Sequence, residues 1–579
     1  MSVLVAAASS THLTLPKIAW LSILPVIAML AGAVVLLSGS AVARRQIETV
    51  WVTTITVATA SVALVLSLFQ WFDVQDHGPH VAIDGSIVQD GFSALVSILV
   101  SCAVFISAFV GDGWLRRDRI VGPEFQVLMM VSASGAMIMG MANDLIVVFL
   151  GLEIMSIALY VLAAFNSRRS ESGEAALKYF VLGSFSSAVF LYGIALVYGS
   201  VGSTNLVQIS DYFSHNIVLH NGLLLAGLAL LLVGFGFKIA AVPFHLWTPD
   251  VYQGSPTPVT GFMAAVAKAG GFAALLRVFI TSFGLLRTDW QPAVWVLAAL
   301  TLLLGSIVAL VQRDIKRMLA YSSINHAGFI LLGLQAADSK GVEASLYYLF
   351  VYTFMVIGTF AIVTIVGGTG DGAHDLGRYR NLSARQPWLA ASLAILLVAQ
   401  AGIPFTTGFL AKLEVLDAAV GAHSTVLAVI AMVTAVIAAF FYLRVIVLMY
   451  APAVGAGAVQ AGAAEAGAGT GASEDADPPI VDVSLAEITD VDAPRANGGD
   501  GAARRSTSGV AVLAPAEEAE KAEEADEAEV LHAEDEADMP IPASTSFAIV
   551  LCVAVTVFFG IYPSPLTDLA HQATLLIRP

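Results

Sequence analysis

The sequence predicts an all-α polytopic membrane protein, and three observations carry this prediction. Hydrophobic residues form 58% of the 579-residue chain and charged residues only 12%, with a mean hydropathy of +0.82. A soluble domain carries about 25% charged residues. Apolar runs of about 20 residues, long enough to cross the hydrocarbon core as helices, recur along the chain. Basic residues also collect in alternate connecting loops, which is typical of loops on alternating sides of a membrane.

The apolar runs predict fourteen transmembrane helices, since a single spanning segment satisfies its own backbone hydrogen bonds in hydrocarbon only as a helix. The first run is too long for a signal-peptide core and is therefore interpreted as a retained span. The expected limits are 18–38, 50–70, 91–111, 122–141, 144–165, 175–200, 222–246, 257–283, 292–311, 316–336, 343–367, 388–417, 424–450 and 544–563.

The basic residues of the loops predict the orientation. Without the segment 451–540, loops after odd-numbered spans contain 13 Arg or Lys residues, whereas loops after even-numbered spans contain 2, Arg287 and Lys340. Cytoplasmic loops are enriched in Arg and Lys. We therefore expect the odd-numbered loops to face the cytoplasm and both termini to lie outside.

Two prolines interrupt the predicted spans 7 and 12. Pro243 and Pro404 each remove a backbone donor inside an apolar run. Interrupted helices five spans apart are the expected trace of an inverted repeat, because an odd offset reverses the orientation of the second copy. The predicted organisation is spans 1–3 in residues 1–121, a first half of spans 4–8 in 122–283, a second half of spans 9–13 in 284–450, an insert in 451–540, and span 14 with the C-terminus in 541–579.

The insert accounts for the whole net charge of −17. Residues 451–540 contain 21 Asp or Glu and 4 Lys or Arg, and they are rich in Ala and Gly. Such a composition has too few large apolar side chains to form a core. We expect a disordered cytoplasmic segment, which is either a tolerated solvated loop or a docking segment for a basic partner.

Isolated ionisable residues lie inside the apolar runs. An ionised side chain at the bilayer centre costs about 2.5–3.5 kcal/mol even on the most lenient scale, so such residues mark functional sites by default. Desolvation favours the neutral form of a lysine and a nearby carboxylate favours the charged form, so a buried lysine beside a glutamate can load and release a proton. The candidates for a proton path are Glu153, Lys178, Lys238, Lys268, His326 and Lys412.

Structural alternatives exist for several of these residues. Lys238 can be a snorkelling lysine on a kinked helix. Lys178 can form an ordinary i,i+4 surface pair with Glu174. His326 can be a hydrogen-bonded core histidine, and Arg277 in span 8 can snorkel to the membrane surface.

Cysteine and glycine motifs argue against a redox centre in this chain. Cys102 and Cys552 are the only cysteines, and each lies in an apolar span, so no Cys-x-x-Cys motif can hold an iron–sulfur cluster. No Gly-x-Gly-x-x-Gly motif lies between a strand and a helix. We expect neither a bound cofactor nor a nucleic-acid partner.

Three segments resemble the core of the antiporter-like, proton-translocating membrane subunits of respiratory complex I. They are residues 238–261, 319–328 and 402–412, and the similarity extends over roughly 120–450. Residues 260–271 lack the histidine of subunits L and M and of Mrp-type antiporters, and Lys412 stands where subunit M usually has glutamate. The chain is thus most similar to the subunit N family of bacterial NADH–quinone oxidoreductase.

The resemblance implies a role for each candidate residue. Glu153 matches the glutamate that pairs with the lysine of span 7, Lys238. Lys268 matches the central lysine of span 8, and Lys412 matches the residue of span 12 that faces the outer exit.

Two further positions match the family pattern. Lys178 matches a lysine of span 6 near the cytoplasmic side, and His326 matches a histidine that bridges the two half-units. The acidic insert departs from the usual length of the family and inherits no role.

The resemblance also implies a non-redox subunit of a proton-pumping translocase in a bacterial inner (plasma) membrane. NADH, FMN, iron–sulfur clusters and a quinone would bind to other subunits. Outer loops rich in Ala and Val, with Arg favoured over Lys, suggest a high-GC bacterium, in which the quinone can be menaquinone. The implied partners are the lipid bilayer, membrane subunits of the A, H, J, K, L and M types and, indirectly, the peripheral arm. An Mrp-type sodium/proton antiporter subunit and a membrane-bound hydrogenase subunit are the alternatives.

Overall fold

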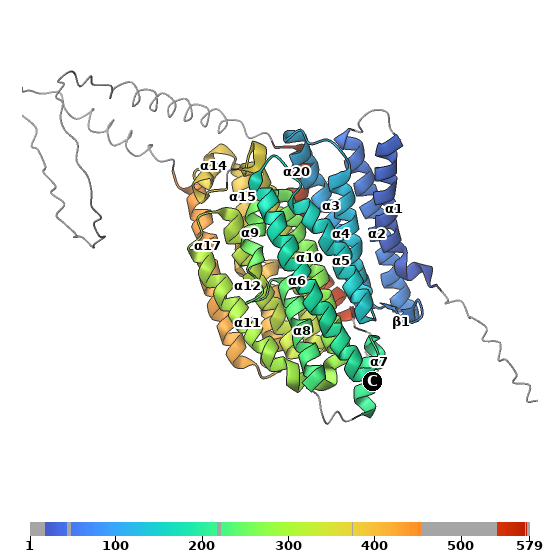
Figure 1. Cartoon of the computed structure of the whole chain (residues 1–579). Helices are drawn as coiled ribbons and strands as arrows, with labels where there is room; N and C mark the ends of the chain where they lie inside the picture. The colour runs from blue at the N-terminus through green and yellow to red at the C-terminus, as the bar shows by residue number, and fades with distance from the viewer. Residues whose placement is uncertain are drawn as a thin grey trace, which may run out of the picture. The chain divides into compact units, whose positions relative to one another are not determined.

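The computed structural model describes residues 18–42, 48–216, 222–372, 374–452, 541–573 and 575. These residues form a bundle of long helices that lie side by side (Figure 1). Of the predicted insert 451–540, only Ala451 and Pro452 are described, so the predictions for the rest of the insert lie outside the described residues. The longer helices are α1 (Trp20–Val42), α2 (Thr49–His77), α3 (Gly91–Arg117), α4 (Glu124–Met141), α5 (Leu145–Ala163), α6 (Ser170–Val201), α8 (Gly222–Ile239), α10 (Thr257–Arg277), α11 (Arg287–Leu310), α12 (Ile315–Ala336), α13 (Ser339–Val366), α15 (Pro387–Ala401), α16 (Thr407–Gly421), α17 (Thr425–Tyr450) and α20 (Ala543–Ile561).

Shorter elements connect these helices. A π-helical turn (Val278–Ser282) and 3-10 turns at Gly284–Leu286, Thr369–Asp371 and Leu376–Tyr379 fill the connections. The short helices are α7 (Leu206–His215), α9 (Trp247–Gly254), α14 (Leu382–Arg385) and α21 (Ser564–Gln572).

The membrane class is confirmed at the level of the helices. Among the described residues, twelve helical segments are long and apolar enough to cross a membrane. Predicted span 10 corresponds to α12, a 22-residue helix that is not among the twelve. Predicted span 12 corresponds to two 15-residue helices, α15 and α16, which are separated by a break. The predicted count of fourteen therefore depends on these two segments.

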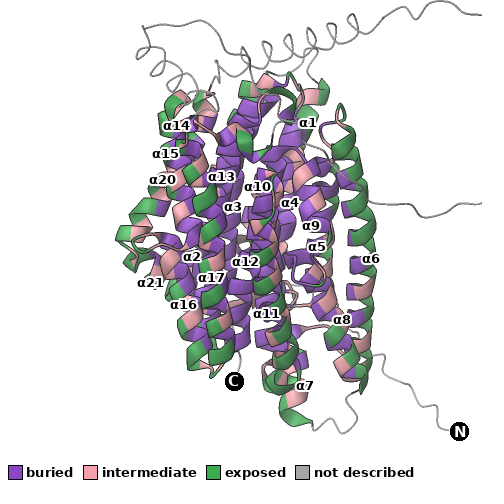
Figure 2. Ribbon diagram, turned by 90° about the vertical axis from the view of Figure 1, so that its left-hand side faces the viewer, coloured by how far each residue is buried: buried purple, intermediate pink, exposed green. Residues whose placement is uncertain are grey.

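The core of the bundle is formed by helices that are apolar on all sides. Every residue of α10 is buried, and α13 is buried over most of its length. Such helices lie inside a large or membrane-embedded protein. The outer helices instead expose large apolar side chains, for example Phe72 on α2, Phe185 on α6 and Val436 on α17 (Figure 2). Exposed apolar surface of this extent is typical of contact with lipid or with other membrane proteins.

Two interruptions divide helical runs inside the bundle. After α8, Ala240 adopts a left-handed φ of 61°, and the chain resumes as α9 only at Trp247, beyond Pro243. After α15, Gly402 caps the helix with a φ of 80°, a conformation that favours glycine. Thr406 then accepts a hydrogen bond from the Phe409 backbone N–H at 3.4 Å and starts α16. Both interruptions lie where the sequence places prolines.

A small hairpin accompanies the helices at one end of the bundle. Strands β1 (His80–Ala82) and β2 (Ile87–Gln89) pair antiparallel, with Val81 opposite Val88. The tight turn between them requires left-handed backbone at Ile83, Asp84 and Gly85. These six residues are not predicted as strands from the sequence, because each strand is only three residues long.

Arg277 corrects one interpretation of the sequence, because it does not snorkel. Its side chain is 1% exposed, and its two terminal nitrogens contact the two carboxylate oxygens of Asp90 at 2.9 and 2.8 Å. Its Nε donates to the Gly140 carbonyl at 2.9 Å. Asp90 directly follows the hairpin and caps α3, so this planar bidentate pair fastens α10 to the start of α3. A paired arginine need not reach water.

Candidate functional site

Lys238 lies at the end of α8, directly before the first helix interruption. Its side chain is 4% exposed, and its ammonium donates to the Ser156 hydroxyl on α5 at 2.9 Å and to the Tyr179 hydroxyl on α6 at 3.3 Å. The ammonium also lies 5.7 Å from the centre of the Tyr179 ring. Neutral oxygens and an aromatic face therefore hold this lysine, which is buried rather than snorkelling.

Glu153 lies on α5, three residues before Ser156 and hence on the same side of that helix. Its Oε1 atom is buried and has no hydrogen-bond partner among the described residues. The hydrogen bonds of the Lys238 ammonium go to the Ser156 and Tyr179 hydroxyls, and the Glu153 carboxylate does not come within ion-pair distance of it. The expected Glu153–Lys238 pair is therefore not a direct contact in this structure.

Lys268 lies in the middle of the fully buried helix α10. Its ammonium donates to the backbone carbonyl and, at 2.8 Å, to the hydroxyl of Ser323 on α12. The ring of Tyr352 on α13 lies 5.1 Å away, and the Tyr352 hydroxyl donates to Ser323 at 2.9 Å. The hydroxyl of Tyr252 on α9 approaches the same serine at 3.4 Å. Ser323 thus connects Lys268 with two tyrosines.

His326 lies one turn beyond Ser323 on α12 and is 1% exposed. Its Nδ1 lies 2.7 Å from the Tyr348 hydroxyl on α13, and its Nε2 lies 3.0 Å from the Tyr442 hydroxyl on α17. Tyr442 also bonds to Ser322. The histidine is therefore a hydrogen-bonded core residue, which is the structural alternative named for it above. Its two partners are hydroxyls that both donate and accept protons, so the same geometry suits a relay.

Lys412 lies on α16 beside the second interruption and is 5% exposed. Its ammonium donates to the carbonyls of Ala401 at 2.7 Å and Gln400 at 3.1 Å. These carbonyls form the C-terminal end of α15, where the helix dipole favours a cation. The Phe329 ring of α12 lies 5.0 Å from the ammonium. The broken helix thus supplies the acceptors that an unbroken one would have used internally.

Lys178 does not join the buried residues. Its side chain is 43% exposed, and its ammonium contacts Glu174 at 2.7 Å and Asp250 at 2.9 Å. The i,i+4 pair that the sequence left open is therefore present. Asp250 contacts Arg317 on α12 as well, at 2.9 Å. Lys178 belongs to a surface network of ion pairs beside a cavity of about 450 Å³.

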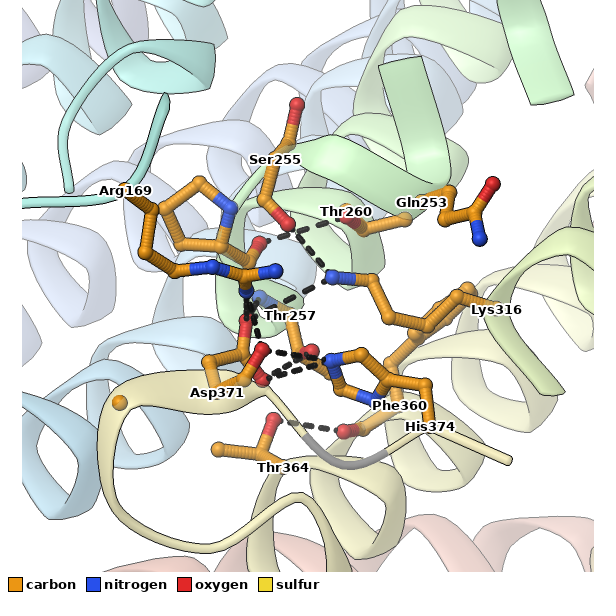
Figure 3. A network of polar contacts seen from close by, with 12 residues as sticks. Arg169, Gln253, Ser255, Thr257, Thr260, Lys316, Phe360, Thr364, Asp371 and His374 are labelled. Atoms are coloured by element: carbon orange, nitrogen blue, oxygen red, sulfur yellow. Dashed lines mark hydrogen bonds and ion pairs between the residues drawn. The ribbon is translucent and has the colours of Figure 1, made fainter. Parts of the chain in front are cut away.

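A second buried cluster, centred on Asp371, was not found from the sequence (Figure 3). Asp371 follows α13 and is fully buried. It accepts hydrogen bonds from the backbone N–H of Thr257 at 2.8 Å and from its hydroxyl at 2.6 Å, and it pairs with Lys316 at 3.4 Å. His374 and Arg169 approach it at 3.3 and 3.7 Å.

The charge of Asp371 is set by these neighbours. Burial tends to raise the pKa of Asp371, but the Lys316 ammonium and the bonds from His374 and Thr257 hold the pKa well below its ordinary value. Because the folded pKa lies below the unfolded one, the stabilisation is present at neutral pH and is lost only as the pH falls through the folded pKa. No local sequence signal joins residues 169, 257, 316, 371 and 374, which explains why the cluster was missed.

The described residues contain no group of three or more His, Cys, Asp or Glu side chains that could hold a metal ion. They do contain a series of buried lysine ammonium groups and hydroxyls, which are contributed by α8, α5, α10, α12 and α16. Buried ionisable groups beside broken helices, within an apolar bundle, are typical of ion-translocating membrane proteins.

Comparison with known proteins assigns the family. Residues 142–438 match the family model described as NADH:quinone oxidoreductase/Mrp antiporter, transmembrane. The chain is 48% identical over 354 residues to NADH-quinone oxidoreductase subunit N of Parafrankia sp., which covers 61% of this chain and 67% of the relative. Subunit N 3 of Streptomyces griseus is 39% identical over 77% of this chain and 88% of its own length. The chain belongs to the family of NADH-quinone oxidoreductase subunit N.

Solved structures agree with this assignment. A chain of respiratory complex I from Thermus thermophilus, solved with bound aureothin, superposes with a TM-score of 0.63 at 33% identity and covers 74% of this chain and 90% of its own. The membrane-bound sulfane sulfur reductase of an archaeon and the Mrp complex of Dietzia sp. share the fold over 96% of each chain, with TM-scores of 0.71 and 0.70 at 21% and 19% identity.

Proposed function

We propose that this chain is a proton-translocating membrane subunit of NADH–quinone oxidoreductase. The observation that carries this proposal is the placement of Lys238, Lys268 and Lys412, each buried and each bonded to neutral oxygens. A hydroxyl or carbonyl oxygen stabilises an ammonium less than a carboxylate does, which suits a group that must release its proton. The identity to subunit N relatives of NADH-quinone oxidoreductase supports the same function.

The proposed path runs across the bundle in three stages. Lys238 takes up a proton under the influence of the Glu153 carboxylate, whose approach or withdrawal switches the lysine between loading and release. Water and the hydroxyls around Ser323 connect Lys238 with Lys268 on α10. His326 then passes the proton to Lys412, which releases it at the second helix interruption. In this scheme Lys178 acts before the path, at the cavity from which protons are supplied.

The chain does not supply the energy for pumping. Moving one charge against the membrane potential requires about 2.3 kcal/mol per 100 mV. We propose that quinone reduction in other subunits provides it, and that NADH, FMN, iron–sulfur clusters and the quinone bind there. Other membrane subunits and the peripheral arm are the proposed partners of this non-redox translocase subunit.

The proposed topology has fourteen spans in a bacterial plasma membrane. The twelve apolar segments, α12 and the pair α15–α16 together make fourteen spans. The interruptions before Pro243 and Pro404 support an arrangement of two inverted five-helix units. The termini lie outside and the insert 451–540 lies in the cytoplasm. The Mrp and sulfur-reductase structures, below 25% identity, support only the shared fold.

The test combines isolation of the complex with one substitution. The tagged chain should co-purify in a large assembly with flavin, iron–sulfur centres and NADH oxidation. Lys268→Ala should lower NADH-driven proton pumping in inverted vesicles several-fold relative to the amount of assembled complex. Isolation without any NADH-oxidising partner, or unchanged pumping in Lys268→Ala, contradicts the proposed function.

A further inference from the structure

The cavity of about 450 Å³ lies at the end of the bundle where α13 stops, between α6, α9 and α12. Charged residues of both signs line it, and most of them are paired with one another. Lys178 contacts Glu174 and Asp250, and Arg317 contacts Asp250. Asp314 caps α12 by accepting the Arg317 backbone N–H at 2.8 Å. The ionic and hydrogen-bonding groups of these residues are thus paired with one another. A different residue of the cavity has a nitrogen without a hydrogen-bond partner among the described residues.

That residue is His374. It lines the cavity, yet its side chain is only 4% exposed. Its Nε2 lies 2.8 Å from the Asp371 backbone carbonyl and 3.3 Å from the Asp371 carboxylate. Both are acceptors, so Nε2 carries the hydrogen and Nδ1 carries the lone pair. Nδ1 is buried and has no hydrogen-bond partner among the described residues.

A buried acceptor without a partner destabilises the fold unless water or a proton satisfies it. The polar cavity is large enough to hold water, and His374 is one of the residues that line it. The ring packs closely against the Gly367 backbone, because a Cβ added at Gly367 would come within 3.1 Å of both the His374 Cε1 and the Asp371 Oδ1. His374 thus borders the cavity, and its proton acceptor Nδ1 is buried behind the cavity wall.

Asp371 connects this histidine with the helices of the proton path (Figure 3). It bonds to Thr257 at the start of α10, the helix that carries Lys268, and it pairs with Lys316 at the start of α12, the helix that carries His326. The 3.4 Å Asp371–Lys316 contact is the longer of the two polar contacts of the Lys316 ammonium, which lies 2.6 Å from the Ser255 carbonyl. A positive charge on His374 competes with Lys316 for the same carboxylate.

We propose that His374 is a proton-uptake residue at this cavity and that its charge is transmitted through Asp371 to the ends of α10 and α12. Water that enters from the cavity reaches Nδ1 and delivers a proton, the imidazolium pairs with Asp371, and the proton returns to water when the pair reopens. This inference rests on the proposed proton translocation. The charged groups around the histidine, which line the same cavity or belong to the Asp371 cluster, are Asp371, Lys316, Asp314, Arg317, Arg169, Glu171, Glu174, Lys178 and Asp250.

The first test is His374→Gln in the assembled complex. Glutamine keeps an amide donor for the Asp371 carbonyl but cannot take up a proton. In inverted vesicles, NADH-driven pumping by the wild type should fall in a step as the pH rises, because an imidazole takes up a proton less readily at higher pH. At pH values below this step, the variant should pump several-fold more slowly than the wild type, and its pH profile should show no such step. His215→Gln on the exposed end of α7 is the matched control and should keep the wild-type profile.

A second variant separates proton uptake from a structural role. His374→Ala leaves space for a small base, so added imidazole should restore pumping together with its pH step. A wild-type profile in His374→Gln, an unchanged step at a lower rate, or no rescue by imidazole overturns the inference. If Lys268→Ala abolishes pumping while His374→Gln leaves it intact, only the role of His374 fails; if Lys268→Ala also pumps normally, the proposed function fails.

Discussion

At the scale of single residues, neutral oxygens rather than carboxylates hold the buried ammonium groups. Ser156 and Tyr179 bind Lys238, Ser323 binds Lys268, and the end of α15 binds Lys412. Glu153 is the carboxylate that we propose acts on Lys238. Its buried Oε1 atom has no hydrogen-bond partner among the described residues. This difference between Glu153 and its neighbours gives the first prediction.

Glu153→Gln should lower proton pumping and coupled NADH–quinone activity several-fold while leaving assembly near normal. The amide keeps the size of the side chain but removes the charge that acts on Lys238. No described hydrogen bond to Oε1 is lost, so the fold should tolerate the change. Pumping and complex content are measured in the same vesicles. Glu48→Gln, at the exposed start of α2, is the matched control.

Two results would contradict this prediction. Full activity in Glu153→Gln excludes a switch that depends on its charge. A loss of pumping that is entirely explained by a loss of assembled complex makes Glu153 a structural residue.

Lys412 separates a proton carrier from a structural cation. Lys412→Arg also places a cation at the Gln400 and Ala401 carbonyls, but guanidinium does not release its proton in proteins. If Lys412 carries protons, Lys412→Arg should be nearly as impaired as Lys412→Ala, with pumping reduced several-fold, and Lys412→Glu should retain part of the function. Pumping and NADH oxidation are compared in membranes of the three variants. Wild-type behaviour of the arginine variant with an inactive glutamate variant would show that Lys412 only holds the fold.

At the scale of the elements, the helix interruptions create the sites. The end of α15 presents free carbonyls only because the chain turns at Gly402, whose φ of 80° favours glycine. The same glycine makes room for the lysine, since an added Cβ would lie 2.7 Å from the Lys412 Cδ. The position of the ammonium therefore depends on a residue ten positions earlier in the chain.

Gly402→Ala should displace Lys412 and reduce pumping several-fold, with a smaller effect on the amount of assembled complex. The substitution adds backbone strain at a left-handed residue and a clash with the lysine side chain. Gly39→Ala in α1 is the control, because nothing lies within 4 Å of its added Cβ. Equal pumping in both variants would show that the geometry of the interruption does not position the proton carrier.

At the scale of the whole molecule, the acidic insert and the orientation of the chain are linked. If residues 451–540 face the cytoplasm without a packed core, added protease should cut them in inside-out vesicles and leave them intact in right-side-out vesicles. The fragments are detected with tags on either side of the insert. Cleavage only from the outer side, or protection in both preparations, contradicts the predicted topology. Deletion of roughly 455–535 should preserve assembly unless the insert is a docking segment.

The sequence by itself determined the class of the protein and the candidates for its path. Composition and the length of the apolar runs require membrane helices, since hydrocarbon leaves the backbone no other partner. The cost of a charge in that environment made Lys238, Lys268 and Lys412 stand out, and all three are buried. The two helix interruptions also followed from local chemistry, because proline and glycine act on their own stretch of backbone.

Only the tertiary structure decided which groups meet. It placed Lys178 in a surface ion-pair network, and it kept Arg277 inside the bundle on Asp90, 187 positions away in sequence. It also brought His374, Asp371 and Lys316 together beside a cavity. The physical reason is that burial makes a residue conspicuous through its own solvation cost, whereas the partner that offsets this cost is chosen by helix packing between distant segments, for which a single sequence carries no local signal.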